Sequence, residues 1–452
     1  MPQAGRCGPA EIPGHGTLLP PLQACEPGES ARPGAPQVLR IRIKSYSIGS
    51  NSITIINSVT TTDISMSPFR YRRGLTAAVL AALVLVVFAA GCTGTEADPA
   101  GAPGDGQTVT VTDGFGKTVA VPSPPESVVC SGSGCLRYLV YLQSQDLAAG
   151  VDDQEKKDQP MEGRPYALAY GAQFKDLPLI GEFRGKDDPE KILVIGPEVI
   201  FKTGATGTAY GTSAAEADKL QERTGIPVVA FPYGSLRNDA EKAEMYAGLR
   251  TMGEVLGRED RAEEVIAYIE ATIADLEART ADIPDAKQKT VYIGGVSMAG
   301  AHGIISTEPA YPPFSWVNAK NAAAGLGTAH ADVAKEALID WDPGYIFIDL
   351  GTTQLENDGA IGELKTDPAL RGLSAVQEGR VYGVLPYNFY SVNYETILAD
   401  AYFIGKTLYP DRFADIDPEE KADEIYTFFV GKPVFDEHNN EYRNLGFREI
   451  PL

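Results

Sequence analysis

One short pattern occurs twice in this chain, 146 positions apart. Both copies read ExxxxxxPxxIF, the first from Glu190 to Phe201 and the second from Glu336 to Phe347. Each copy predicts a short helix that a proline ends, followed by a buried strand that begins with β-branched and aromatic residues. One helix–strand unit used twice predicts two similar α/β lobes, and a ligand cleft often lies between two lobes. A chance match is the alternative, since helix–proline–strand is a common local arrangement.

Residues 66–91 have the pattern of a secretory signal. The stretch MSPFRYRRG at its start is basic, and the uncharged apolar run 75–90 follows it. A transmembrane anchor is the alternative, but the run is shorter than the roughly 18 to 20 apolar residues that span a membrane comfortably. Cys92 stands where the lipobox of secreted lipoproteins has its lipidated cysteine, although Ala89 occupies a position where leucine is usual. A lipid on Cys92 or an uncleaved segment would each hold the remainder outside the cytoplasmic membrane.

The segments on either side of this signal are predicted to lack a fixed fold. Residues 92–106 are rich in Gly, Pro and other small residues, which is typical of a flexible tether. Residues 1–65 are rich in Pro, Gly, Ser and Thr and would precede a signal that normally begins a protein. We therefore expect Met66 to be the true start. Residues 1–65 would then be a disordered or misassigned extension, without function for its Cys7, Cys25 and His15.

The charge of the chain excludes some partners. Of the 39 basic and 61 acidic residues, 8 and 4 precede residue 92, which leaves 31 basic and 57 acidic residues and a formal charge of −26. Such an acidic surface is a poor partner for nucleic acid or anionic lipid headgroups. It suits a soluble monomer that a tether holds near a membrane. The roughly 345 residues after the tether exceed one ordinary domain and suit two.

Helices and strands alternate through the rest of the chain. Residues 107–257 open with a predicted β-hairpin, at 108–112 and 117–121, and continue with short strands and helices at 126–129, 136–145, 192–201, 214–223, 227–231 and 239–256. Residues 281–452 resume the alternation, with strands at 290–294 and 380–384, the second copy of the repeat within 333–349 and a helix at 393–408.

A long amphipathic helix is predicted between these halves, at 258–280. Its apolar positions lie on one face, and charged residues occupy the rest: Ala262, Val265, Ile266, Ile269, Ile273 and Leu276. A helix of this length between two α/β halves is the expected connector of two lobes. A helix that merely covers a sheet is the alternative.

From about Gln107 to its end, the chain resembles the extracytoplasmic substrate-binding proteins of iron-siderophore, haem and vitamin B12 ABC importers. The order and spacing of several segments carry this resemblance: TVTDGFGKTVAVP, ESVV, DPEKILVIGPEVIF, GIPVVAF, LGREDRAEEVIAYIE, WDPGYIFIDLG, LSAVQEGRVYGV and NYETILADAYFIGKTLYPDRF. It implies an α/β fold of the helical-backbone periplasmic-binding-protein kind, with two Rossmann-like lobes, 107–257 and 281–452, bridged rigidly by one helix, 258–280. It also implies a ligand held between the lobes, and a permease dimer with cytoplasmic ATPases as partners.

The resemblance also implies a role for Glu190 and Glu336. In the vitamin B12 and siderophore members, one glutamate on each lobe docks into a basic pocket of the permease, and both fall at the Glu of a pattern like this one. Carboxylates at both ends of the molecule can pair with arginines and report that both lobes are in place. The alternative is a solvated glutamate near a helix N-terminus, where acidic residues are favoured anyway.

The loop Cys130-Ser-Gly-Ser-Gly-Cys135 joins a predicted strand to a helix. Backbone N–H groups in such a loop can receive an anion or a carbonyl-rich ligand. In the family this loop borders the cleft, so we expect Ser131, Gly132 and Ser133 to touch the ligand. A local disulfide between the two cysteines is the expected state outside the cytoplasm, and a CxxxxC pair alone is weak evidence for a metal.

Further ligand contacts are expected from other loops. Arg184 precedes the first repeat helix and could pair with an anionic chelate, or be an ordinary surface arginine. Aromatic and polar residues concentrate in two loops of the second half: His302, Tyr311, Phe314 and Trp316, then Tyr387, Asn388, Phe389 and Tyr390. Together they suggest a wall for a large flat or catecholate-like ligand, and each alone is more often a packing residue.

The residue inventory argues against other functions. After Cys92 the chain has three widely separated histidines, His302, His330 and His438, so direct capture of a metal ion is not expected. No GxSxG, Walker loop or HExxH motif is present, which argues against an enzyme, although some chelatases share a cleft of this kind. We therefore expect a membrane-tethered receptor, without a cofactor, that carries a metal chelate, first of all a ferric siderophore, to an ABC permease. A corrinoid or haem is the alternative ligand.

Overall fold

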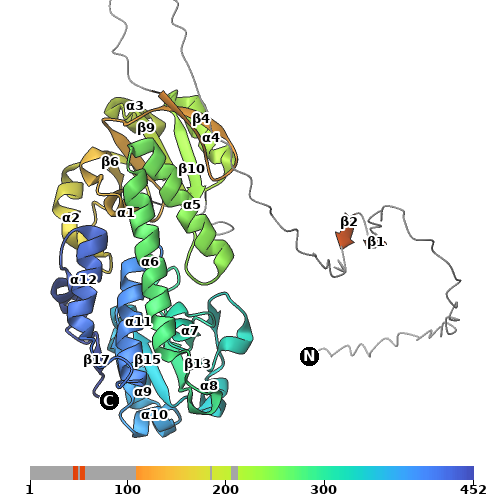
Figure 1. The fold of residues 1–452 in the computed structure, drawn as a ribbon, viewed down its shortest axis with the longest axis vertical. Coiled ribbons are helices and arrows are strands. Elements are labelled where there is room, and N and C mark those ends of the chain that lie inside the picture. The colour runs from red at the N-terminus through yellow and green to blue at the C-terminus, as the bar shows by residue number, and fades with distance from the viewer. Residues whose placement is uncertain (1–43, 49–50, 56–107, 184–185, 205–211) are drawn as a thin grey trace, which may run out of the picture. The chain divides into compact units, whose positions relative to one another are not determined.

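The computed structural model describes residues 44–48, 51–55, 108–183, 186–204 and 212–452 (Figure 1). The chain forms two compact units, 1–97 and 98–452. In the first unit, strands β1 (Lys44–Ile48) and β2 (Asn51–Ile55) pair as an antiparallel hairpin, within the extension that was predicted to be disordered. The predicted signal, the tether and Cys92 lie outside the described residues. In the described ranges, no helix is both long and apolar enough to cross a membrane.

Within the second unit, the described part of the N-terminal lobe contains a six-stranded sheet of order β10–β9–β5–β6–β7–β8. All its pairs are parallel except β7–β8. Every residue of β5 and of β9 is buried, as expected where helices cover both faces of a parallel sheet. The strands are β5 (Val128–Ser131), β6 (Ala148–Asp152), β7 (Leu179–Glu182), β8 (Lys186–Asp187), β9 (Val199–Gly204) and β10 (Val228–Pro232).

Helices alternate with these strands, as the sequence predicted. They are α1 (Cys135–Tyr141), α2 (Pro165–Asp176), α3 (Pro189–Ile195), α4 (Ala214–Thr224) and α5 (Asp239–Leu256). The predicted opening hairpin is confirmed as β3 (Thr108–Thr112) and β4 (Thr118–Pro122). Strands β6 and β7 and helix α2 were not predicted, because Ala-Ala-Gly in β6 and a glycine within α2 weaken the local signal.

The described part of the C-terminal lobe holds a five-stranded sheet of order β13–β11–β15–β16–β17. Its strands are β11 (Thr290–Gly294), β13 (Lys320–Asn321), β15 (Tyr345–Asp349), β16 (Val381–Val384) and the antiparallel edge strand β17 (Arg448–Glu449), and β12 (Ser306–Thr307) pairs separately with β14 (Ala331–Asp332). The helices are α7 (Pro312–Trp316), α8 (Lys335–Trp341), α9 (Ala360–Thr366), α10 (Ser374–Gln377), α11 (Tyr394–Leu408), α12 (Pro418–Val430) and α13 (Phe435–Glu441).

The repeated pattern has the same structure in both lobes. Its glutamate is the second residue of a seven-residue helix, α3 or α8, and its proline stands between the helix and the strand, β9 or β15. The Ile-Phe pair of each copy is fully buried. Both strands are flanked by two parallel neighbours, β5 and β10 around β9, and β11 and β16 around β15. The predicted pair of α/β lobes is therefore confirmed.

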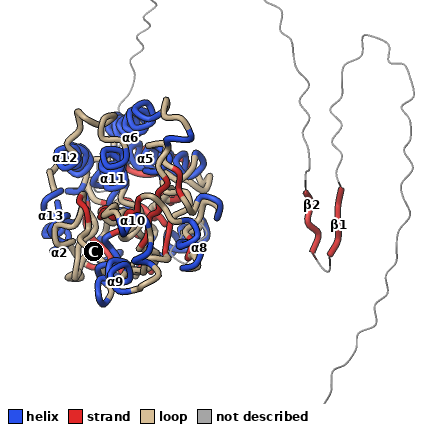
Figure 2. The backbone as a smooth tube through the Cα atoms, turned by 90° about the horizontal axis from the view of Figure 1, so that it is seen from below, coloured by secondary structure: helices blue, strands red, loops and turns tan. Residues whose placement is uncertain are grey.

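Helix α6 (Glu259–Thr280) runs along both lobes and packs against α5 and α11 (Figures 1 and 2). Its predicted apolar face is buried, with Ala262, Val265 and Ile269 inaccessible to solvent. The bridging helix is thus confirmed. The chain nevertheless crosses between the lobes more than once, because α12 returns to pack against α1 and α2.

Aromatic and arginine side chains hold this second crossing in place. The ring of Tyr268 on α6 stacks on Phe428 of α12 with centroids 4.0 Å apart. Arg261, also on α6, donates from Nε to the Tyr141 carbonyl at 3.0 Å and from a second nitrogen to the Phe428 carbonyl. Helices α6, α1 and α12 therefore form one packed joint.

Candidate functional site

A polar cluster lies at the carboxyl edge of the N-terminal sheet. Ser131 ends β5, and its Oγ donates to Asp187 Oδ1 of β8 at 2.5 Å. Lys202 of β9 donates to Ser131 Oγ at 3.2 Å and pairs with Asp187 Oδ2 at 2.6 Å. All three side chains are almost fully buried. A buried lysine needs such a partner, because an isolated charge in an apolar interior is very costly.

Ser131 was predicted from sequence, whereas Asp187 and Lys202 were missed. The available signal was Lys202 itself, a cation directly after the Ile-Phe pair of a strand that is otherwise buried. Gly132 and Ser133 continue the same loop. Gly132 has φ of 90°, and a Cβ there would lie 1.9 Å from the Thr203 carbonyl oxygen, so the loop requires glycine at this point. Ser133 is buried, and Arg184 lies outside the described residues.

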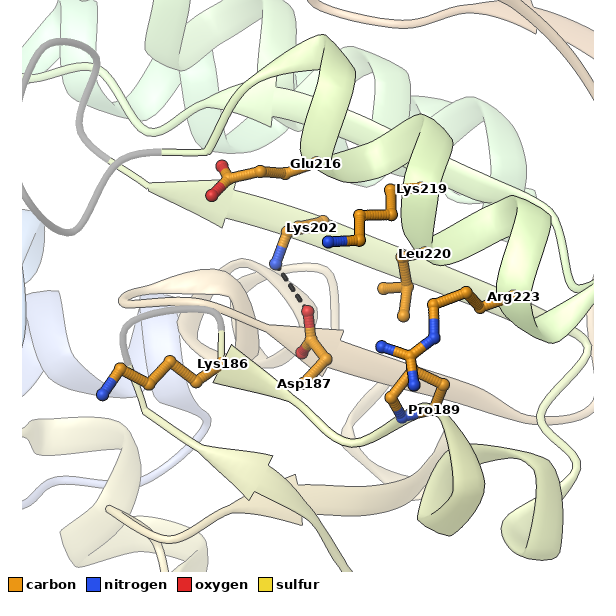
Figure 3. A pocket seen from close by; sticks show the side chains of 8 residues that line it. All are labelled: Lys186, Asp187, Pro189, Lys202, Glu216, Lys219, Leu220 and Arg223. Carbon is orange, nitrogen blue, oxygen red and sulfur yellow. Dashed lines mark hydrogen bonds and ion pairs between the residues drawn. The ribbon is translucent and has the colours of Figure 1, made fainter.

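A pocket opens beside this cluster, between β8, β9 and α4 (Figure 3). It contains about 480 Å³ of space open to solvent. Four cationic side chains line it, Lys186, Lys202, Lys219 and Arg223, together with the carboxylates of Asp187 and Glu216 and the apolar side chains of Pro189 and Leu220. Lys219 and Arg223 stand one turn apart on α4 and are exposed. Their charges make no hydrogen bond or ion pair with any described residue.

Arg137 of α1 ties the two lobes together. It is fully buried, and one terminal nitrogen donates to Tyr233 Oη at 2.5 Å. The other donates to Asn393 Oδ1 at 2.7 Å and to the Phe389 and Tyr390 carbonyls at 3.3 and 3.2 Å. Asn393 directly precedes α11 and lies 256 positions after Arg137 in the sequence. Sequence reasoning missed Arg137, although a lone arginine inside the apolar run LRYLVYL was a signal.

Two carboxyl groups take part in further contacts between the lobes. Tyr390 donates its hydroxyl to Asp152 at the end of β6, and burial, with Glu155 nearby, raises the pKa of Asp152 to about 7. Arg237 Nη1 lies 3.9 Å from Glu308 Oε1. Burial also raises the pKa of Glu308 to about 7, although Arg237 and the Tyr387 hydroxyl, 3.1 Å away, favour its ionised form.

The aromatic wall predicted for the C-terminal lobe is only partly present. Tyr311, Phe314 and Trp316 are buried, because residues 312–316 fold as α7, which packs on α11. These three are core residues, which corrects the prediction that they face a ligand. Tyr387 is also buried and hydrogen-bonded to Glu308, so it is occupied within its own lobe.

The remaining predicted residues lie closer to the junction of the lobes. Asn388 donates to the Ser297 carbonyl at 2.6 Å, and Tyr390 reaches across to Asp152. His302 is partly exposed, and its Nε2 lies 2.9 Å from the Met298 carbonyl oxygen. In the described ranges, no group of three or more His, Cys, Asp or Glu side chains could hold a metal ion.

The disulfide expected between Cys130 and Cys135 is not formed. Both are free, buried thiols, one on β5 and the other at the start of α1. Cys135 Sγ donates to the Phe201 carbonyl at 3.6 Å. Burial, with Cys130 as a close neighbour, raises the pKa of Cys135 well above its usual value, so this thiol is neutral and packed as an apolar group.

Both predicted docking glutamates are exposed, each in the first turn of its helix. Beside Glu190, α3 also exposes two apolar side chains, Leu193 at 51% and Val194 at 89% of their full accessibility. The docking role itself remains a prediction.

Comparison with known proteins agrees with this architecture. Residues 153–387, just over half of the chain, match a family model described as periplasmic binding protein. The molybdate-binding protein MolA of Haemophilus influenzae is 22% identical over 336 residues, which cover 71% of this chain and 90% of that protein. The solved structure of MolA bound to molybdate matches with a TM-score of 0.57 and 18% identity, covering 72% of this chain and 98% of that one.

Two proteins of Bacillus subtilis (strain 168) are also similar. The uncharacterized ABC transporter substrate-binding lipoprotein YvrC is 22% identical and covers 76% of this chain and 99% of its own length. The petrobactin-binding protein YclQ is 24% identical and covers 66% of this chain and 87% of its own length. At these identities, the structural likeness establishes the fold.

Proposed function

This chain belongs to the periplasmic binding protein family, and from that premise we propose that it is the substrate-binding receptor of an ABC importer. The receptor would capture a metal-containing small molecule at the junction of the lobes and deliver it, chemically unchanged, to a permease dimer driven by cytoplasmic ATPases. The observation that carries the proposal is the matched pair of exposed glutamates, Glu190 and Glu336, at the same position of one repeated unit on two lobes. A carboxylate on each lobe supports docking to a partner that meets both lobes at once.

We propose a ferric siderophore as the first candidate ligand. The petrobactin-binding relative supports this choice, since petrobactin is the ligand that its name records. A molybdate-type oxyanion is the second candidate, favoured by the similarity to MolA and by the cationic pocket of the N-terminal lobe. We further propose that Cys92 anchors the receptor by a lipid at the outer face of the cytoplasmic membrane, an assignment that the lipoprotein relative supports.

Ligand-induced thermal stabilisation tests the choice of ligand. A ligand that binds only the folded state stabilises it by RT ln(1 + [L]/Kd), about 2.7 kcal/mol at a hundredfold excess over Kd. We expect a rise in Tm with a ferric siderophore or with molybdate, and a smaller or no rise with haem and cobalamin. The reverse order would move the assignment to the haem or corrinoid members. Measurable turnover of a ligand without any rise in Tm would mean that the protein is an enzyme and not a receptor.

The double variant Glu190→Ala, Glu336→Ala tests docking. We expect it to abolish import in cells while leaving ligand affinity within twofold, because both carboxylates are exposed and lie on the outer helices α3 and α8. The matched control is Glu244→Ala with Glu254→Ala, which removes two exposed glutamates from α5 and should leave import intact. Loss of affinity in the first variant would mean that these glutamates serve the ligand site.

A further inference from the structure

The pocket between β8, β9 and α4 is the cationic feature that favours an oxyanion among the candidate ligands. Its lining brings together side chains from β8, α3, β9 and α4, and Figure 3 shows Lys219 and Arg223 reaching toward Lys202 and Pro189. We propose that this pocket binds the anionic group, a carboxylate or an oxyanion, of the transported ligand. The inference rests on the proposed function and adds the charge of the substrate to it.

The balance of charge in the pocket favours an anion. Asp187 is already committed, since both of its carboxylate oxygens are bonded, to Lys202 and to Ser131. Glu216 is held at the start of α4, where its carboxylate accepts from Ser213 Oγ at 3.2 Å. Among the described residues, Lys186 has only a long, exposed ion pair with Glu182, at 3.5 Å, which contributes little. Lys219 and Arg223, unpaired within the described ranges, therefore leave a local excess of positive charge.

The local positive charge of the pocket contrasts with the acidic charge of the rest of the chain. The segment from residue 92 onward carries a formal charge of −26, so the field of the protein repels small anions in general. An anionic ligand would therefore need a concave site in which several cations converge at close range, where salt screens less than it does over long distances. Guanidinium and ammonium groups bind carboxylates and oxyanions through short, charge-assisted hydrogen bonds.

The pocket adjoins the carboxyl edge of the N-terminal sheet. In open α/β sheets, ligands bind outside the carboxyl ends of the parallel strands. Ser131 is the last residue of β5, and Lys202 lies near the end of the neighbouring β9. The hydrogen bond between these two residues joins the floor of the pocket to the loop 131–134, where the sequence predicted ligand contacts.

The test compares charge-removing variants in the intact protein, with ferric citrate and sodium molybdate as anionic probes and a cationic ferric trihydroxamate as the contrasting probe. We expect wild-type protein to bind at least one anionic probe in calorimetry. Lys219→Gln with Arg223→Gln should weaken that binding at least tenfold and reduce its dependence on salt. Which probe responds identifies the source of the anionic group, a carboxylate chelate or an inorganic oxyanion.

Two controls isolate the pocket from net charge and from folding. Lys242→Gln with Arg250→Gln removes two cations from α5, outside the pocket, and should change affinity less than twofold. Lys219→Arg with Arg223→Lys keeps the charges and should restore most of the binding. Unchanged affinity for the anionic probe in the pocket variant would overturn the inference while leaving the proposed function intact. Binding of the cationic trihydroxamate alone would do the same, whereas a wild-type protein that binds none of the probes would overturn both.

Discussion

The two copies of the repeated unit share a backbone plan but differ in the side chains that stabilise it. In the N-terminal lobe, Asp188 caps α3 by accepting from the backbone N–H groups of Glu190 and Lys191 at 3.1 and 3.3 Å, and Gly196 ends the helix in the left-handed region. In the C-terminal lobe, Ala334 offers α8 no cap, and Asp342 ends that helix with φ of 38°.

The strained end of α8 is compensated by a contact from elsewhere. The Asp342 carboxylate accepts from Ser374 N at 2.7 Å and from Ser374 Oγ at 2.6 Å, so the start of α10 stabilises a conformation that glycine would adopt freely. The comparison teaches that the pattern specifies the exposed glutamate, the proline and the buried Ile-Phe pair. The helix ends are stabilised by whatever lies nearby.

The strands that follow the two helices differ in charge. Immediately after the Ile-Phe pair, β9 continues with Lys202, which pairs with Asp187 in the floor of the cationic pocket. In β15 the polar residue comes one position later, as Asp349, fully buried and with one carboxylate oxygen unpaired among the described residues. Equivalent strands thus end in a cation in one lobe and in a buried carboxyl group in the other.

The largest effect is expected from truncating the equivalent buried aromatics. Phe201→Ala and Phe347→Ala should each lower the free energy of unfolding by about 3 to 5 kcal/mol, since both side chains are fully buried. Phe347 should cost more, because its ring contacts those of Phe314, Tyr382 and Phe403, whereas Phe201 has no ring contact in the described part of the chain. Urea unfolding measures both, with half-exposed Leu193→Ala as control; equal losses would mean that the aromatic cluster adds nothing.

An intermediate effect is expected from pH. Burial raises the pKa of Asp349 to about 7, against the hydrogen bond that its carboxylate accepts from Gly351 N. Between about pH 4 and 7 the folded protein therefore binds more protons than the unfolded chain, so the contribution of Asp349 to stability is lost as pH rises through 7, at up to about 1.4 kcal/mol per pH unit.

The variant Asp349→Asn isolates this contribution. It keeps an oxygen that can accept from Gly351 N and removes the charge, so it should flatten the decline in stability between pH 4 and 7 and be more stable than wild type at pH 8. Denaturant titrations at several pH values measure this, with Asp411→Asn as a control at an exposed position. A decline as steep as that of the wild type would assign the pH dependence to Asp152 and Glu308 instead.

The smallest effect tests the difference between the helix starts. Asp188→Ala should lower the free energy of unfolding by about 1 kcal/mol, because it leaves two N–H groups of α3 without their acceptor. Ala334→Asp should add about 0.5 to 1 kcal/mol to α8, because Ala334 already has the extended backbone of an N-cap, with φ of −66° and ψ of 140°. Thermal unfolding measures both, and Ala337→Asp inside α8 is the control that should not stabilise. If Ala334→Asp did not raise the free energy of unfolding, the C-terminal end of α8 would be the part that limits its stability.

Elements with a strong local pattern could be predicted from the sequence, whatever their length. The helix at 239–256 and the strand at 290–294 match the structure residue for residue, and the bridging helix differs by one residue at its start. Helix α12 was missed, although Asp417 and Pro418 mark its start and Gly431 its end. Its return to the N-terminal lobe depends on packing, which no local pattern reveals.

At the candidate site, the sequence identified the loops that carry polar residues, but not the residues with which these loops form hydrogen bonds. It singled out Ser131 and Tyr390, but it did not predict Asp187, Lys202, Arg137 or Asp152, to which these two residues or their loops are bonded. It also assigned Tyr311, Phe314 and Trp316 to a ligand wall, where burial makes them core. Periodicity distinguishes an apolar face from a polar one, but an aromatic residue in a short irregular segment has no period to read.

The sequence by itself determined the repeated unit, the two lobes and the helix between them, because each follows from the spacing of apolar residues, prolines and caps within a few turns of chain. Only the tertiary structure decided which charges meet. Lys202 finds Ser131 across 71 positions, and Arg137 finds Asn393 across 256. Such contacts depend on how whole elements pack, and a buried charge is tolerated only where that packing supplies its partner.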